Sequence, residues 1–127
     1  MDYVIFAIDN NTDTHTVAKF MRHIDTKRAL GTMKGRMVQA IGYWEGILEP
    51  SYIMRKDDYL AFAQGYTKGQ DAVMVAPSDN RQPAYLMNST MTDYQVTLNP
   101  IREVSAEDAK SAQGWTFNQS SNKYFVA

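Results

Sequence analysis

The segment Tyr3–Ile8 constrains the fold most, because it is apolar on both of its alternating faces. A strand with this pattern lies in the middle of a sheet whose two faces are both covered. Turn and N-cap residues follow at positions 9–13, and apolar residues then recur with the spacing of one helical face until Gly31. The chain is therefore expected to begin with a central strand and a helix that packs against the sheet.

The next segments predict further strands and one more helix. Short β-prone stretches bounded by turn residues predict strands at 37–44, 51–54, 70–76 and 84–87. Asp57 and Asp58 supply caps and negative charge for a second helix, which is expected to end at Gly69. This order of elements is βαββαβ, the ferredoxin-like arrangement with two helices on one face of an antiparallel sheet.

The expected domain organisation is one domain spanning residues 1–127, as is usual for a chain of this length. Residues 1–90 are expected to form an α+β ferredoxin-like sandwich, and residues 91–127 a C-terminal β extension packed on that core. In the extension we expect a strand near 94–98, a helical turn capped by Ser105 and a hairpin over 115–126. A ferredoxin-like sheet leaves one face without helices, so either this extension or a second subunit is expected to cover it.

Composition and charge narrow the classes of function. Thirteen Lys and Arg residues against 14 Asp and Glu give a net charge of −1, without a basic block for a nucleic-acid backbone. The absence of cysteine excludes disulfides, thiolate metal sites and cysteine nucleophiles, and the two histidines are too far apart along one helix to share a metal. No apolar run is long enough to span a bilayer, and the N-terminus is acidic where a signal peptide is basic. We expect a cytoplasmic protein that acts on a small molecule, with no metal, nucleic acid or membrane partner.

The stretch G-Y-W-E-G-I-L-E-P-S-Y at 42–52 brings glycines, aromatics and carboxylates together at the end of a predicted strand. Gly42 and Gly46 allow close approach of a ligand to the backbone, and Pro50 holds Glu49 in an extended conformation. A fixed carboxylate beside an aromatic ring suits an ammonium or sulfonium ligand. The alternative is an ordinary polar hairpin loop with surface glutamates.

This stretch and two others resemble the bacteriophage-encoded S-adenosylmethionine lyases, which are also called S-adenosylmethionine hydrolases. The other two are the strand Q-D-A-V-M-V at 70–75 and the closing Q-G-W-T-F-N-Q-S-S-N-K-Y-F-V. The resemblance implies a homotrimer with a ferredoxin-like core and active sites between subunits. It also implies cleavage of S-adenosylmethionine to 5′-methylthioadenosine and homoserine lactone, which depletes the cofactor of host restriction and methylation.

The resemblance also assigns site residues. Glu49 matches the glutamate of the family, whereas Trp44 stands at the position of the family tyrosine and Tyr43 comes one residue earlier. We predict Glu49 and Tyr43 as catalytic residues on this basis. As our own hypothesis, Trp44, Gly46, Ser51 and Gln70 are predicted to bind the substrate. In this hypothesis Glu49 holds the substrate ammonium and Tyr43 or Trp44 lies against the sulfonium. No cofactor is expected, because the substrate's own carboxylate can attack its γ-carbon.

Two non-enzymatic functions are the alternatives. One is a trimer that binds an adenine nucleotide, for which basic residues around the phosphates are needed and the acidic hairpin gives no support. The other is a phage protein that inhibits a host enzyme by direct contact. Turnover of S-adenosylmethionine distinguishes the enzyme from both.

Overall fold

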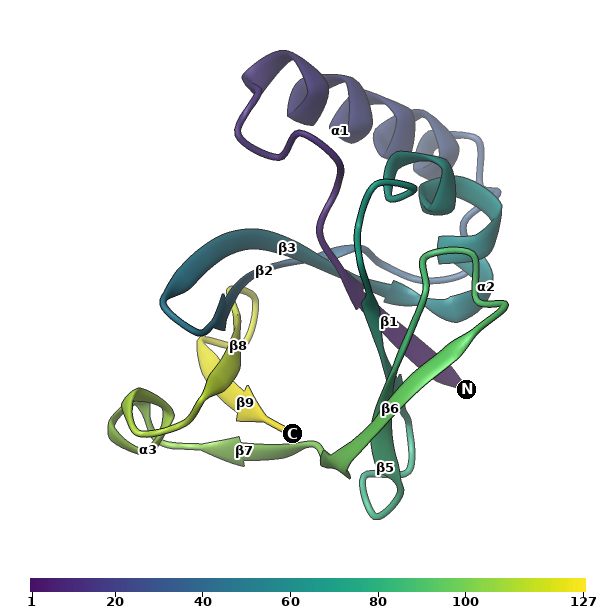
Figure 1. Cartoon of the computed structure of the whole chain (residues 1–127). Helices are drawn as coiled ribbons and strands as arrows, with labels where there is room; N and C mark the ends of the chain where they lie inside the picture. The colour runs from purple at the N-terminus through teal and green to yellow at the C-terminus, as the bar shows by residue number, and fades with distance from the viewer.

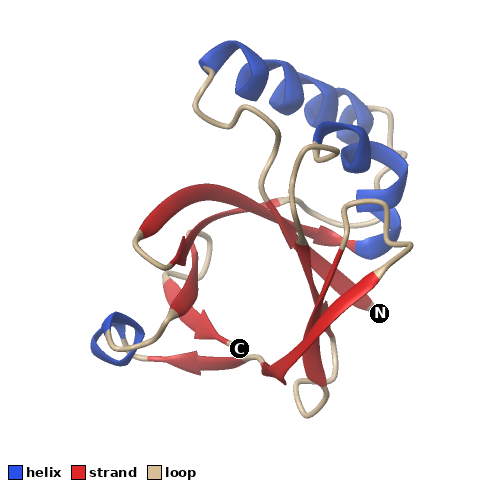
Figure 2. Cartoon of the chain, in the orientation of Figure 1, coloured by secondary structure: helices blue, strands red, loops and turns tan.

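The computed structural model describes the whole chain, residues 1–127. Its strands are β1 (Asp2–Phe6), β2 (Val38–Trp44), β3 (Ile47–Arg55), β4 (Val73–Pro77), β5 (Pro83–Met87), β6 (Tyr94–Pro100), β7 (Arg102–Val104), β8 (Gly114–Asn118) and β9 (Lys123–Val126). They form one nine-stranded sheet in the order β6-β5-β4-β1-β3-β2-β8-β9-β7, and every neighbouring pair is antiparallel. The sheet curls into a half-barrel (Figures 1 and 2).

The main helices lie on the outer side of the curl, over the middle of the sheet (Figure 2). The long helix α1 spans Thr14–Ala29, and α2 (Lys56–Asp58) continues into a π-helical turn, Tyr59–Ala63, and a 3-10 turn, Gln64–Tyr66. The short helix α3 (Ala106–Lys110) connects β7 to β8. None of these helices is long and apolar enough to cross a membrane.

Local sequence signals explain where α1 begins and ends. The Asp13 carboxylate accepts a hydrogen bond from the backbone N–H of His15 at 2.9 Å, which caps the first turn. Gly31, just beyond the last turn, has a φ of 71°, a left-handed conformation that glycine adopts without strain. The predicted first helix is therefore confirmed.

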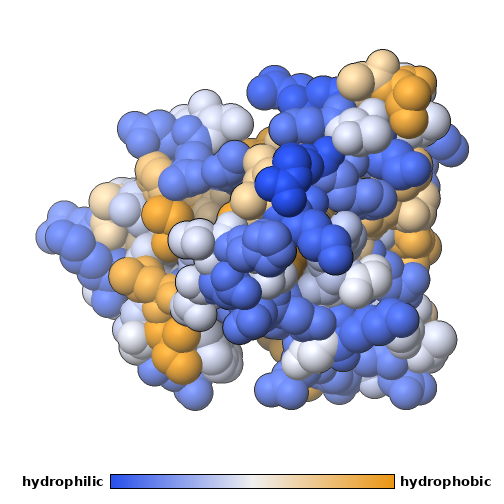
Figure 3. Space-filling view, turned by 90° about the horizontal axis from the view of Figure 1, so that it is seen from above, coloured by the Kyte–Doolittle hydropathy of each residue, from blue (hydrophilic) through white to orange (hydrophobic).

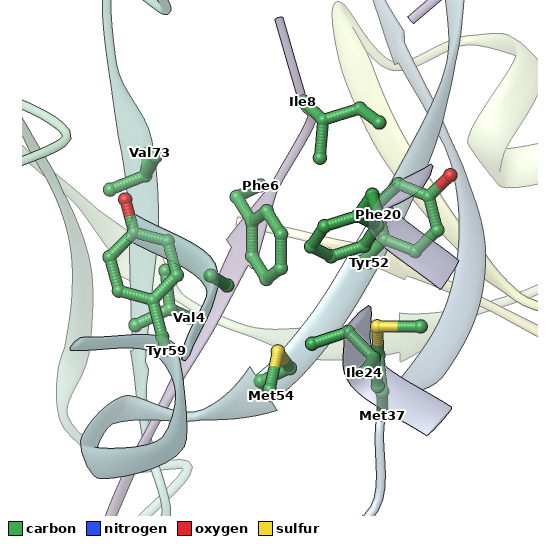
Figure 4. Close-up of a cluster of buried hydrophobic side chains, with 11 residues drawn as sticks. Val4, Phe6, Ile8, Phe20, Ile24, Met37, Tyr52, Met54, Tyr59 and Val73 are labelled. Atoms are coloured by element: carbon green, nitrogen blue, oxygen red, sulfur yellow. The ribbon is translucent and has the colours of Figure 1, made fainter. Parts of the chain in front are cut away.

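The core lies between the outer face of the sheet and the helices (Figure 4). Its 11 buried residues are Val4, Phe6, Ile8, Phe20, Ile24, Met37, Tyr52, Met54, Tyr59, Ala63 and Val73. Aromatic rings dominate its centre, with ring centroids 5.0 Å apart for Phe6 and Tyr59 and 5.1 Å apart for Phe20 and Tyr52. Since Val4 and Phe6 face the helices, the intervening residues of β1 face the inside of the curl.

The prediction of a ferredoxin-like βαββαβ sandwich with a C-terminal β appendage is wrong. Strands β6 to β9 do not form a separate layer, because they extend the same sheet at both edges. The predicted second helix is replaced by one α-helical turn and two turns of other helical types, so little helical surface covers the strands. Curvature of one large sheet, rather than two layers of equal extent, gives this chain its shape.

The bend between β6 and β7 joins the two edges of the sheet. Strand β6 pairs with β5 at one edge, β7 pairs with β9 at the other, and only Ile101 separates the two strands. Pro100 has no N–H to donate and a fixed φ, so it suits the corner where one strand leaves its partner. The chain therefore bridges both edges of the curled sheet at this corner.

Candidate functional site

A row of paired residues crosses the inner face of the curl. Glu49 on β3 lies opposite Gly42 on β2, Gly42 lies opposite Thr116 on β8, and Thr116 lies opposite Phe125 on β9. Tyr52 is a core residue and faces the helices. Glu49 is three residues before it on the same strand, and because side chains alternate along a strand, Glu49 faces the inside of the curl. Directly paired residues share a face of the sheet, so the others face the same way. We call Glu49, Gly42, Thr116 and Phe125 the inner row.

The carboxylate of Glu49 is half-buried and has no partner in the chain. The side chain takes part in no hydrogen bond, and all four ion pairs involve other residues. Burial raises the pKa of the Glu49 carboxyl above its ordinary value, because water is partly removed from the charged form. A partly dehydrated carboxylate without a partner is suited to bind a cationic group.

Gly42 lets the Ser51 hydroxyl lie close to the backbone of β2, beside Glu49. A Cβ atom at this position would lie 3.0 Å from the Ser51 hydroxyl oxygen, which is tighter than an ordinary contact. Ser51 is 7% exposed and donates its hydroxyl hydrogen to the backbone oxygen of Glu49 at 3.2 Å. The predicted binding residue Ser51 thus lies on the same face as Glu49, with its hydrogen engaged by the strand itself.

The two hairpin aromatics point to opposite faces. Tyr43 lies opposite Leu48 on the outer face and stacks on Trp115, with centroids 5.3 Å apart and an interplanar angle of 16°. Trp44 lies opposite Ile47 on the inner face, and its ring covers Gly114, where an added Cβ would lie 2.6 Å from Cε3. The structure therefore separates Tyr43 from Glu49 and places Trp44 on the Glu49 face.

The other predicted binding residues lie away from the inner row. Gly46 forms the tip of the β2–β3 hairpin with Glu45, and φ values of 88° and 47° at these two residues are those of a tight primed turn. Gln70 follows the 3-10 turn and donates its side-chain amide to the backbone oxygen of Ile8 at 3.3 Å. Gly46 therefore shapes the hairpin, and the Gln70 amide holds the segment that follows β1.

Sequence reasoning missed three residues near Glu49. Thr116 and Phe125 reach the inner row only through the pairing of β2 with β8 and of β8 with β9. Asn11 donates its amide to the backbone oxygen of Pro50, and its own Oδ1 is buried without a donor. The alternation of Trp115, Thr116 and Phe117 was the one sequence signal for a strand there, and it carried no information on which strand it would join.

The exposed end of the hairpin is apolar. Ile47 and Leu48 are 66% and 63% exposed, and in the view from the helix side apolar groups lie at the end of the molecule that carries this hairpin and also at the opposite end (Figure 3). No group of three or more His, Asp or Glu side chains converges in a way that could hold a metal ion.

Neither a protein-family model nor a curated protein matches the sequence.

Proposed function

We propose that this protein cleaves S-adenosylmethionine to 5′-methylthioadenosine and homoserine lactone on the inner face of its curled sheet. The observation that carries the proposal is the half-buried Glu49 carboxylate, which has no partner in the chain and lies opposite Gly42 on the inner face. This geometry favours a small cationic ligand, and S-adenosylmethionine carries both an ammonium and a sulfonium. The choice of this ligand rests on the resemblance of the hairpin stretch to the phage lyases.

The reaction needs no nucleophile from the protein. An oxygen of the substrate carboxylate attacks the substrate γ-carbon, so that a C–O bond forms as the C–S bond breaks. The electron pair of the C–S bond passes to sulfur, which leaves as a neutral thioether, and no proton moves. The reacting carboxylate and sulfonium neutralise each other, so binding in a surface with little water favours the transition state.

The residues of the candidate site then have separate roles. Glu49 pairs with the substrate ammonium, which keeps its charge throughout the reaction, and thereby folds the substrate toward attack. Pairing with the sulfonium instead would stabilise the ground state, whose charge disappears in the transition state. Trp44, on the same face, offers the sulfonium an aromatic surface. Tyr43 acts only through the hairpin, because it stacks on Trp115 on the other face.

Assembly and cellular role belong to the same proposal. A homotrimer would cover the exposed side of the inner face and remove water from the Glu49 site. In the cytoplasm of a phage-infected cell, cleavage would deplete the cofactor of host restriction and methylation. Sedimentation of the purified chain tests the trimer separately from the activity.

The decisive experiment is incubation of the purified protein with S-adenosylmethionine, with both products followed by chromatography. Wild type should form both products, whereas Glu49→Gln should lose about 30-fold or more in kcat/KM, the effect of removing one member of a desolvated charge pair. The matched control is Glu45→Gln, because Glu45 is exposed in the hairpin turn and accepts a hydrogen bond from Gln113 at 3.1 Å. Equal turnover by wild type and Glu49→Gln, or no turnover by folded wild type, would reject the proposal.

A further inference from the structure

A second candidate site lies on the outer face, away from Glu49. A groove of about 490 Å³ opens between α1, the start of β2 and the turn that joins β8 to β9. Its polar walls include Arg28, Arg36, Gln39, Gln119 and Ser120. Gln39 pairs with the core residue Tyr52, which faces the helices, so the groove and the inner row are on opposite faces of the sheet.

The two arginines give the groove its positive charge. Neither guanidinium takes part in an ion pair or a side-chain hydrogen bond within the chain, and Asp25 is the one acidic residue in the lining. The position of Arg28 in the last turn of α1 has a structural reason, since cations are favourable at helix C-termini. Arg36 lies on the loop before β2 and has no such reason, yet it borders the same groove.

Backbone hydrogen bonds hold the neutral donors in place. The N–H of Gln119 donates to the backbone oxygen of Gln39 at 3.1 Å, which joins the β8–β9 turn to β2. The Asn118 carboxamide oxygen accepts from the N–H of Ser120 at 2.9 Å and from that of Ser121 at 3.1 Å, which fixes the turn. Gln119 and Ser120 therefore border the groove from a turn with a defined shape, and Gln39 borders it from β2.

We infer that this groove binds the phosphate monoester of a small hydroxylated molecule, such as a nucleoside monophosphate. Guanidinium groups match the oxygens of a phosphate with paired hydrogen bonds, and amides and hydroxyls complete such sites. The volume is that of a small-molecule site and exceeds what a lone phosphate fills. Met21 and Met37 give an apolar wall for the rest of the ligand, and the Asp25 carboxylate can accept from its hydroxyl groups.

A titration of the full chain with adenosine monophosphate, followed by amide chemical shifts and calorimetry, tests the inference. Binding should saturate, with shifts confined to the C-terminal half of α1, the start of β2 and the β8–β9 turn. Adenosine and inorganic phosphate should each bind about tenfold or more weakly, because each lacks one half of the recognised ligand. The same shifts with equal affinity for adenosine, or for phosphate alone, would overturn the ester assignment.

Matched variants separate the groove from the rest of the surface. The double variant Arg28→Gln/Arg36→Gln should weaken adenosine monophosphate binding about tenfold or more while the far-UV circular dichroism stays unchanged. Arg22→Gln is the control, since Arg22 is exposed on the same helix and does not border the groove. Unaltered binding in the double variant contradicts the site, as does binding of a single-stranded oligonucleotide in preference to the monophosphate. Glu49→Gln should bind the monophosphate as wild type does. The monophosphate site and the lyase activity are therefore tested independently of each other.

Discussion

At the scale of single residues, Glu49 carries a stability cost as well as the proposed function. Its carboxylate is half-buried, burial raises its pKa, and no group in the chain compensates the charge. Residues that bind charged ligands often destabilise the unliganded fold in this way. Such a cost is measurable without any assay of activity.

Replacement of Glu49 by Gln should therefore raise the melting temperature at about pH 7, where wild type is ionised. A carboxyl whose pKa is raised in the folded state binds its proton more tightly there than in the unfolded chain. Its favourable contribution is fully present below the unfolded pKa, near 4.5, and is lost as the pH rises through the higher folded pKa. The advantage of Glu49→Gln should thus shrink as the pH is lowered toward that value, as measured by calorimetry over a pH series. An advantage that is constant with pH would show that the charge of Glu49 costs nothing.

Gly42 offers a steric test of the inner face around Glu49. A Gly42→Ala side chain would meet the Ser51 hydroxyl at 3.0 Å and crowd the inner face opposite Glu49, where the substrate is proposed to bind, so we expect kcat/KM to fall about tenfold. Gly65→Ala is the matched control, because a Cβ there meets nothing within 4 Å and φ at Gly65 is not positive. Equal kinetics for both variants in steady-state assays would show that the substrate does not bind against this part of the inner face.

At the scale of elements, sequence signals within one segment predicted the element correctly, whereas elements that depend on contacts with distant segments were not predicted. The cap at Asp13 and the apolar spacing after it lie within α1 itself, and the helix was predicted from them. The strand β7 was missed because Arg102–Val104 is three residues long and acquires strand geometry only by pairing with β9. The second helix departs from a regular α-helix where the Tyr59 hydroxyl bonds Ser89 and Thr67, contacts that lie outside any local pattern.

Asp58 joins two elements through buried hydrogen bonds. It is 2% exposed, and its carboxylate accepts from the N–H groups of Lys34 and Gly35, both at 2.8 Å. The substitution Asp58→Ala leaves two donors without their acceptor and should lower the free energy of unfolding by about 3 kcal/mol. Urea unfolding with an unchanged m-value measures this loss. The neighbouring Asp57→Ala should cost less, because Asp57 is 43% exposed in its surface ion pairs; an equal cost would contradict the assigned role of Asp58.

At the scale of the whole molecule, the pairing of distant strands decides both the curl and the composition of the candidate site. The sequence predicted Glu49, Ser51 and Trp44, because all three belong to one hairpin. It did not predict the inner row, since the partners of β2 come from the last strands of the chain and strand periodicity does not specify a partner. The ferredoxin-like prediction failed for the same reason, because the order of elements along the chain left the edges of the sheet undetermined.

The helices cover only part of this sheet, so its strands should open at different rates. Residues of β1, β3 and β4 include the fully buried Val4, Met54 and Val75, whereas β7 to β9 contain no buried residue. Native-state hydrogen exchange should show amides of β1 protected about 100-fold or more over those of β9. Equal protection would mean that the curled sheet unfolds as one cooperative unit.

The two tryptophans make the two faces of the sheet optically distinguishable. Trp44 is 55% exposed on the inner face, and Trp115 is stacked against Tyr43 on the outer face. In Trp115→Phe, emission comes from Trp44 alone and should respond to a ligand at Glu49. In Trp44→Phe, the remaining fluorophore reports on the contact between β2 and the C-terminal strands, so the protein contains its own pair of spectroscopic probes, one for each face.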